Sequence, residues 1–122
     1  MSQMLLSINP EHVENILSGK KKYEFRKVRC RNEINSIIIY ATSPIMRVVA
    51  EVEIIAIIED APQMVWRKTA KNAGITKSFF NQYYEGKAKA VAYELGEVQV
   101  YPEPRELEDL GIRHAPQSFV YV

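Results

Sequence analysis

Apolar and polar positions change period several times along the first third of this 122-residue chain. An apolar run at 4–8 predicts a short strand. Asn9 then supplies a helix cap, with proline as the first helical residue, and Gly19 follows the last apolar position of helical spacing, so we expect a helix between them. Over 23–26 polar and apolar residues alternate, which predicts a half-buried strand.

The middle of the chain carries its longest apolar stretches. One strand is expected over 34–44, ending at a proline, and a second over 45–58. The second strand begins with alternating charged and apolar residues, but 54–58 is apolar throughout. We therefore expect this strand to bend or bulge and to pass into the interior.

Two capped helices and three short strands are expected in the remainder. Asp60 can cap a helix that ends at Gly74, and Thr76 can cap a second helix. Three prolines limit the segment 102–117 to at most one helical turn. The strands are expected at 89–95, at 98–101 after a turn at Gly96, and at 118–122, where the apolar terminus completes a sheet.

This order of strands and helices, without an internal repeat or a linker, favours one α+β domain over residues 1–122. The composition, with 47% hydrophobic and 25% charged residues, is typical of a globular domain. We expect a small mixed or antiparallel β-barrel of about six to seven strands, with two to three helices packed at its ends.

The formal net charge of +1 predicts no general affinity for polyanions, but the charge is unevenly distributed. Seven of the sixteen Lys and Arg residues lie within 20–31, where Glu24 is the single carboxylate. Acidic residues gather at 51–60 and 103–109. Separated charges of this kind can steer an anionic ligand to one end, although clustered lysines are also typical of a solvated rim.

The sequence gives no sign of export, membrane insertion or metal binding. Cys30 is the only cysteine, which excludes an internal disulfide and favours a reducing compartment. No run approaches the ~18 apolar residues of a membrane span. We therefore expect a cytoplasmic protein that does not associate with a membrane. His12 and His114 are far apart in sequence and have no third ligand, so neither a metal nor another cofactor is expected.

The stretch "LSINPEHVENILSGKKKYEFR" resembles the signature of the ASCH domain family, a branch of the PUA-like superfamily. The family motif G-x-K-x-x-E-x-R is matched by Gly19, Lys21, Glu24 and Arg26. The stretch "IIIYATSPIMRVVAEVEI" resembles the two strands that follow in the family. "APQSFVYV" resembles the close of its prokaryotic single-domain members. The resemblance covers nearly the whole chain and implies the PUA-like fold.

The same resemblance implies RNA or nucleotide binding in a cleft lined by the motif, with a role in RNA metabolism or transcriptional regulation. Some family members are enzymes, namely a ribonuclease and an amidohydrolase that deacylates N4-acetylcytidine. The amidohydrolase uses a threonine nucleophile where this chain has Glu24. A hydroxyl nucleophile is therefore missing at that position.

The motif residues can also be interpreted without the family. Glu24 and Arg26 are two apart on one predicted strand, so they share a face and can form an ion pair. Lys21 is expected in the turn after the first helix, free to lean over the cleft. Such a cluster can bind a phosphate or a base edge. Alternatively, Glu24 and Arg26 form a purely structural ion pair that stabilises the mouth of the barrel.

Further side chains are candidates for the wall of the cleft, although each has a plausible structural role in packing, turns or solvation. Ser118 with Lys21 is the one nucleophile and base pairing to consider. Gln117 can bind a base edge. Stacking on unpaired bases is expected from one or more aromatic residues. The candidate ligand-binding residues are Lys22, Tyr40, Ser43, Gln117 and Ser118 beside the motif, with Trp66, Tyr83 and Tyr84 as further stacking candidates.

Three functions follow from these residues. The first is an RNA-binding or nucleotide-binding domain. The second is a metal-independent ribonuclease or nucleoside amidohydrolase, with Lys21 as base or electrostatic stabiliser, Glu24 as general acid or base, and Ser118 as a weaker candidate. The third is a regulatory domain with a protein partner. The oligomeric state stays open.

Overall fold

A single curled sheet organises the protein, which a computed structural model describes over residues 2–122. The sheet of these residues has six strands in the order β2-β5-β4-β3-β1-β6. β1 and β3 are parallel, and all other neighbours are antiparallel. The expected mixed α+β sheet is therefore confirmed, as a curled half-barrel. The strands are β1 (Gln3–Ile8), β2 (Tyr23–Arg26), β3 (Ser36–Ala41), β4 (Arg47–Asp60), β5 (Ala90–Arg105) and β6 (Phe119–Tyr121).

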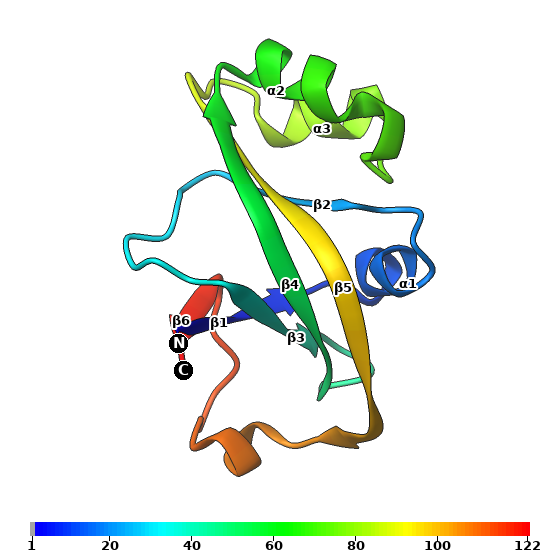
Figure 1. Cartoon of the computed structure of the whole chain (residues 1–122), viewed down its shortest axis with the longest axis vertical. Helices are drawn as coiled ribbons and strands as arrows, with labels where there is room; N and C mark the ends of the chain where they lie inside the picture. Colours follow the sequence, from blue (N-terminus) through cyan, green and yellow to red (C-terminus); the bar gives the residue numbers. More distant parts are fainter. Residues whose placement is uncertain (1) are drawn as a thin grey trace.

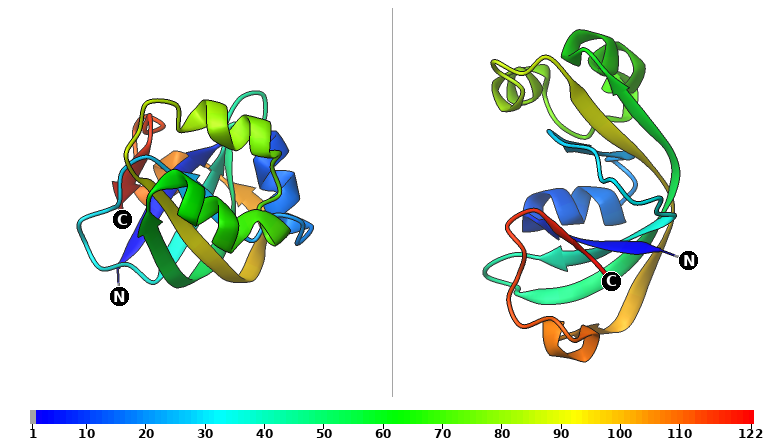
Figure 2. Two further views of the ribbon diagram at one scale, coloured as in Figure 1. Left: turned by 90° about the horizontal axis from the view of Figure 1, so that it is seen from above. Right: turned by 90° about the vertical axis from the view of Figure 1, so that its left-hand side faces the viewer.

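Three α-helices and two 3₁₀ turns complete the described chain: α1 (Pro10–Leu17), α2 (Pro62–Thr69), η1 (Ala70–Asn72), α3 (Lys77–Tyr83) and η2 (Leu107–Leu110). The long β4–β5 pair runs the length of the molecule, with α2 and α3 at one end and η2 at the other (Figure 1). Seen from the side, the sheet bows around α1, which lies on its concave face (Figure 2).

The core is divided by the two faces of the sheet. On β1, Leu6 and Ile8 pack with Val13 of α1 in the main cluster, whereas Leu5 packs on the opposite face with residues near η2. This alternation is the period of two expected of a strand that is buried on both sides. A third cluster, centred on Phe80, lies beneath α2 and α3.

Local capping signals define the start of two of the three α-helices. The Asn9 side chain accepts a hydrogen bond from the Glu11 backbone N–H at 3.0 Å, and Thr76 Oγ1 accepts one from Phe79 at 3.0 Å. Both caps are expected from the sequence. The expected cap at Asp60 is wrong, because Asp60 ends β4 and its Oδ1 accepts from the adjacent Ala61 N–H at 2.7 Å.

The expected turn at Gly96 is wrong, because β5 is continuous from Ala90 to Arg105. A Cβ at Gly96 would overlap the Glu53 carboxylate and lie 2.9 Å from Ile55 Cγ1. Glycine is therefore required here for the close approach of β4 side chains, not for a turn.

The second half of β4 bends as expected but does not enter the interior. Its pairing with β5 shifts register between Val52 and Ile54 and again between Ile54 and Ala56. Ile55 is 60% exposed, which corrects the prediction that 54–58 is buried. Ile54 and Ile57 pack against the main cluster and Ile58 against the Phe80 cluster, whereas Ile55 and Ala56 are exposed.

Candidate functional site

Three of the four motif residues, Lys21, Glu24 and Arg26, line a cavity of about 170 Å³ between α1, β2 and α3. The end of β1 and the start of α1 form one wall, β2 forms the floor, and the segment 75–83 forms the opposite wall. Its charged or titratable lining residues are His12, Lys21, Glu24, Arg26 and Tyr83. Glu24 and Arg26 form the ion pair expected from their spacing.

Lys21 is buried, with 3% of its surface exposed, in the turn between α1 and β2. Its backbone N–H donates to the Asn15 carbonyl at 2.9 Å, so the end of α1 fixes its position. The ammonium donates to the Ala73 carbonyl at 3.4 Å and lies 4.6 Å from the centre of the Phe25 ring. Burial lowers the pKa of Lys21 below its ordinary value, and the nearby Glu24 carboxylate opposes this shift.

Glu24 and Arg26 share one face of β2. Glu24 Oε2 accepts from Arg26 Nε at 2.9 Å and lies 2.8 Å from Nη2. Nη2 also donates to the Ser7 carbonyl at 3.1 Å, so the arginine connects β2 to the end of β1. Within residues 2–122, the hydrogen bond and the ion pair of the Glu24 carboxylate both involve Oε2. Its Oε1 is therefore left as an acceptor for a ligand in the cavity.

His12 reaches the same cavity from the first turn of α1. Its Nδ1 is shielded from solvent and has no hydrogen-bond partner in the described structure. Its ring packs edge-on against Phe79 of α3, with ring centres 5.4 Å apart. Burial and the nearby Lys21 charge lower the pKa of His12 below its ordinary value, so the imidazole is neutral at pH 7.

Two aromatic side chains of α3 line the mouth of the cavity. Phe79 is 45% exposed, although phenylalanine is among the residue types most often buried. Tyr83 lies beside it, with the Lys27 ammonium 4.6 Å from its ring centre, and burial raises the pKa of Tyr83. Of the expected stacking residues, Tyr83 therefore reaches the cavity.

The other expected aromatic residues have packing contacts. Tyr84 is buried, its hydroxyl donates to the Arg26 carbonyl at 2.8 Å, and burial raises its pKa. Trp66 packs on Phe80 beneath α2. Tyr40 is buried on the face of β3 that packs toward η2, away from α1. These side chains do not line the cavity.

The remaining candidate residues lie outside the cavity lining. Lys22 is exposed at the start of β2, and its carbonyl accepts from the Leu95 N–H at 2.9 Å. Ser43 is exposed in the connection between β3 and β4. Gln117 and Ser118 are exposed before β6, and the Ser118 carbonyl accepts from the Ser7 N–H at 3.3 Å. The 116–118 segment is thus adjacent to the wall residue Ser7, while its side chains are not part of the lining.

Sequence reasoning missed His12 and Phe79 as members of the site. From the sequence, His12 is weighed only as a metal ligand. Its position four residues before the buried Ile16 is the one signal that it faces the sheet. Phe79 is separated from the motif by more than fifty residues, so no local pattern could have placed it there.

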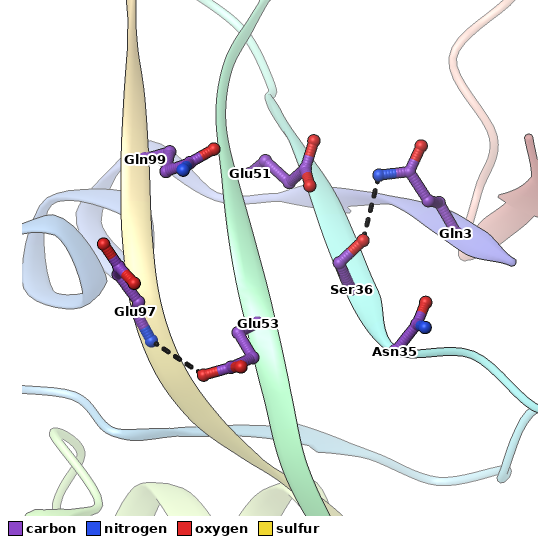
Figure 3. A pocket seen from close by; sticks show the side chains of 7 residues that line it. All are labelled: Gln3, Asn35, Ser36, Glu51, Glu53, Glu97 and Gln99. Atoms are coloured by element: carbon purple, nitrogen blue, oxygen red, sulfur yellow. Dashed lines mark hydrogen bonds between the residues drawn. The ribbon is translucent and has the colours of Figure 1, made fainter. Parts of the chain in front are cut away.

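A second hollow, of about 460 Å³, lies on the opposite face of the sheet from α1 (Figure 3). Three carboxylates line it, from Glu51 and Glu53 of β4 and Glu97 of β5, and no cationic side chain does. Glu53 Oε1 accepts from the Glu97 backbone N–H at 3.4 Å. Because it is acidic, this hollow disfavours a phosphate-bearing ligand.

No helix within residues 2–122 is long and apolar enough to cross a membrane. The same residues contain no group of three or more His, Cys, Asp or Glu side chains that could hold a metal ion.

The sequence profile of the ASCH domain matches residues 6–106, and the chain therefore belongs to the ASCH domain family. An ASCH domain-containing ribonuclease of Zymomonas mobilis is 31% identical over 125 residues, covering 98% of this chain and 84% of that protein. The crystal structure of ASCH from Zymomonas mobilis is 29% identical, with a TM-score of 0.88 over 98% of this chain and 87% of that one.

Large ribosomal subunit protein uL22 of Ureaplasma parvum is also similar, with 28% identity over 120 residues. The match covers 98% of this chain. The chain spans only 39% of the length of that relative.

Proposed function

We propose that the cavity binds one nucleotide of single-stranded RNA. The observation that carries this proposal is the convergence of Lys21, Glu24 and Arg26 on one small cavity with aromatic side chains at its mouth. Cations beside exposed rings are typical of sites for unpaired nucleic acid, because the rings stack on bases and the cations bind phosphates. The similarity to a protein named as a ribonuclease supports an RNA ligand.

The base, and not the phosphate, is the part expected inside the cavity. Glu24 Oε1 is a free acceptor in the wall, and a phosphate group carries only acceptors. A nucleobase with an exocyclic amine can donate to Oε1, in the way that carboxylates accept from cytosine N4. Lys21 and Arg26 then supply donors to the ring or carbonyl acceptors of the same base.

The size of the cavity agrees with a single base. At about 170 Å³ it is smaller than the roughly 300–1,000 Å³ of sites that enclose drug-sized ligands. A duplex or a folded polymer cannot enter. A single-stranded RNA can place one splayed base in the cavity while its backbone stays outside.

The sugar-phosphate backbone of the RNA is expected to follow the exposed cations near the cavity mouth. Lys27 lies over the ring of Tyr83, at the mouth itself. Lys20 and Lys22 flank Lys21 in sequence and are exposed. Exposed lysines of this kind bind phosphates through charge alone, without selecting a sequence.

The test is fluorescence anisotropy with labelled RNA of equal length in single-stranded and duplex form. Single-stranded RNA should bind, and duplex RNA should bind at least roughly tenfold more weakly, because its bases cannot be splayed into the cavity. Cytidine or adenosine should compete better than uridine, which lacks an exocyclic amine. Equal affinity for both forms of RNA would contradict the proposal.

A metal-independent ribonuclease is the second candidate function. It is favoured by the similarity to the Zymomonas mobilis ribonuclease and by the lowered pKa of Lys21, which increases the unprotonated fraction of the amine that can act as a base near neutral pH. Lys21 would act as base or stabilise the developing charge, and Glu24 would act as general acid or base. An amidohydrolase is less favoured, because Glu24 stands where the family's amidohydrolase has its threonine nucleophile.

The enzyme candidate is tested by incubating the protein with labelled RNA in the presence of EDTA, beside Lys21→Met. N4-acetylcytidine in a parallel reaction tests the amidohydrolase. Cleavage or deacylation by the wild-type protein alone would establish an enzyme. Equal background rates for the two proteins would leave binding as the function.

A further inference from the structure

We propose that His12 is a ligand-contacting residue of the cavity, where its neutral imidazole exchanges a hydrogen bond with the bound nucleotide. This inference rests on the proposed nucleotide-binding function and deepens it. It adds a second hydrogen-bonding residue beside Glu24, from an element outside the motif.

The His12 ring has no hydrogen-bond partner within the described residues. Buried polar atoms in proteins are almost always hydrogen-bonded, because an unpaired one costs folding free energy. His12 Nδ1 is the only buried side-chain nitrogen or oxygen without a partner in residues 2–122. None of the hydrogen bonds of the described side chains involves either nitrogen of His12. Because Nδ1 is shielded from solvent, a ligand in the cavity can reach the ring only through Nε2, which also has no partner among the described side chains and is left for a ligand.

Several charged groups surround the His12 ring. The charged groups that act on His12 are Lys21, Arg26, Glu24 and Glu11, from the turn after α1, from β2 and from α1 itself. The Lys21 ammonium opposes protonation more strongly than either carboxylate favours it. The cavity therefore presents two cations, one carboxylate and one neutral imidazole. A neutral imidazole has one donor and one acceptor nitrogen, which suits the mixed donor and acceptor edge of a nucleobase.

The alternative is that His12 only packs. Its ring contacts Phe79 edge-on, with ring planes at 68°, and this contact joins α1 to α3 across the cavity. A phenylalanine would make the same contact without burying an unpaired nitrogen. Packing alone therefore does not explain why this residue is a histidine. A packing-only role predicts that His12→Phe binds RNA as tightly as the wild-type protein.

The experiment compares His12→Phe with His12→Gln, using anisotropy with a labelled single-stranded RNA at pH 7.5 and the unfolding temperature of each variant. His12→Phe keeps the ring contact and removes both nitrogens, so affinity should fall roughly tenfold. His12→Gln restores a hydrogen-bonding group and should recover most of that loss. His114→Gln is the matched control, because His114 is exposed outside the cavity lining.

A second measurement covers the case in which a variant does not fold. The wild-type chain has only two histidines, so ¹⁵N-labelled histidine gives signals that His114→Gln assigns. Saturating RNA should shift the His12 ring nitrogens and leave those of His114 in place.

The outcomes separate the two proposals. If wild-type protein binds no RNA, the proposed function fails and this inference fails with it. If wild-type protein binds and His12→Phe binds equally well, or the His12 nitrogens do not shift, only this inference is overturned. If His12→Gln loses as much RNA affinity as His12→Phe, the hydrogen-bonding role is also overturned.

Discussion

Gly74 lies so close to Lys21 that a Cβ at position 74 would overlap the Cβ and the backbone of the lysine. The segment after α2 is thereby pressed against the turn after α1, and the Ala73 carbonyl accepts a hydrogen bond from the Lys21 ammonium. Gly74 also has a φ of +70°, a conformation that disfavours a side chain. This contact, together with the backbone hydrogen bond of Lys21 to Asn15, holds the buried lysine in the wall of the cavity.

Gly74→Ala should therefore destabilise the protein more than an alanine at another glycine of similar backbone. Gly86 is the matched control, because it has a φ of +76° and a Cβ added there would meet no other part of the described chain within 4 Å. Gly86→Ala should cost about 1–2 kcal/mol of unfolding free energy from backbone strain alone. Gly74→Ala should cost about 1–3 kcal/mol more, because the overlap with Lys21 adds to the strain. Urea unfolding measures both, and equal costs would show that the contact does not constrain Lys21.

Lys21→Met should separate folding from function. The buried ammonium has one hydrogen bond of 3.4 Å and a lowered pKa, so its burial costs free energy that methionine of similar length avoids. The unfolding free energy should stay level or rise by about 1–2 kcal/mol, while RNA binding weakens at least roughly tenfold. Lys22→Met, on an exposed neighbour, should leave the unfolding free energy nearly unchanged and weaken RNA binding by no more than the loss of one phosphate contact. A loss of stability in Lys21→Met would instead assign the lysine a structural role.

Arg26→Leu should be costly because it leaves Glu24 without its partner in the cavity wall. The two side chains are 16% and 8% exposed, and the arginine also donates to the Ser7 carbonyl. We expect a loss of about 2–4 kcal/mol in unfolding free energy. Arg47→Leu is the control, because its ion pair with Glu106 is 44% and 55% exposed and should contribute less than about 1 kcal/mol. Similar losses for the two variants would contradict the buried pair.

The pH dependence of stability should depend on His12. Its pKa is lowered on folding, so below its ordinary value of 6.5 the unfolded chain binds more protons than the folded protein. The unfolding free energy therefore decreases through His12 as the pH falls from above 6.5 toward the lower pKa of the folded state. Urea unfolding at pH 7.5 and 5.5 should show a smaller acid loss in His12→Gln than in wild-type protein. His114→Gln, as the control, should match wild-type protein, and an unchanged loss in His12→Gln would refute the assignment.

Much of the fold could be predicted because its signals are local. Asn9 and Thr76 cap helices through neighbouring backbone N–H groups, and the strand alternation is visible at 23–26. Gly96 is misassigned as a turn from the sequence because its cause is a side chain of β4, more than forty residues away. A glycine in a strand and a glycine in a turn look alike until the packing is known.

The candidate site also contains residues that local sequence predicts and residues that only long-range packing places there. Lys21, Glu24 and Arg26 lie within six residues, so their common location follows from one turn and one strand. Phe79 joins them only through the packing of α3, and Tyr40 is absent because β3 turns that residue to the opposite face of the sheet. Long-range packing decides which aromatic residues line the cavity, and no sequence period encodes it.

Binding of labelled single-stranded RNA at 50 and 200 mM salt, by wild-type protein and by Lys21→Met, tests the central claim most directly. Two or three phosphate contacts predict that wild-type affinity falls roughly 7- to 20-fold over this range, because counterions are released on binding. Lys21→Met, still folded, should bind at least roughly tenfold more weakly at both salt concentrations. Absent binding, affinity independent of salt, or equal affinity of the two proteins would contradict RNA binding through the Lys21 cavity.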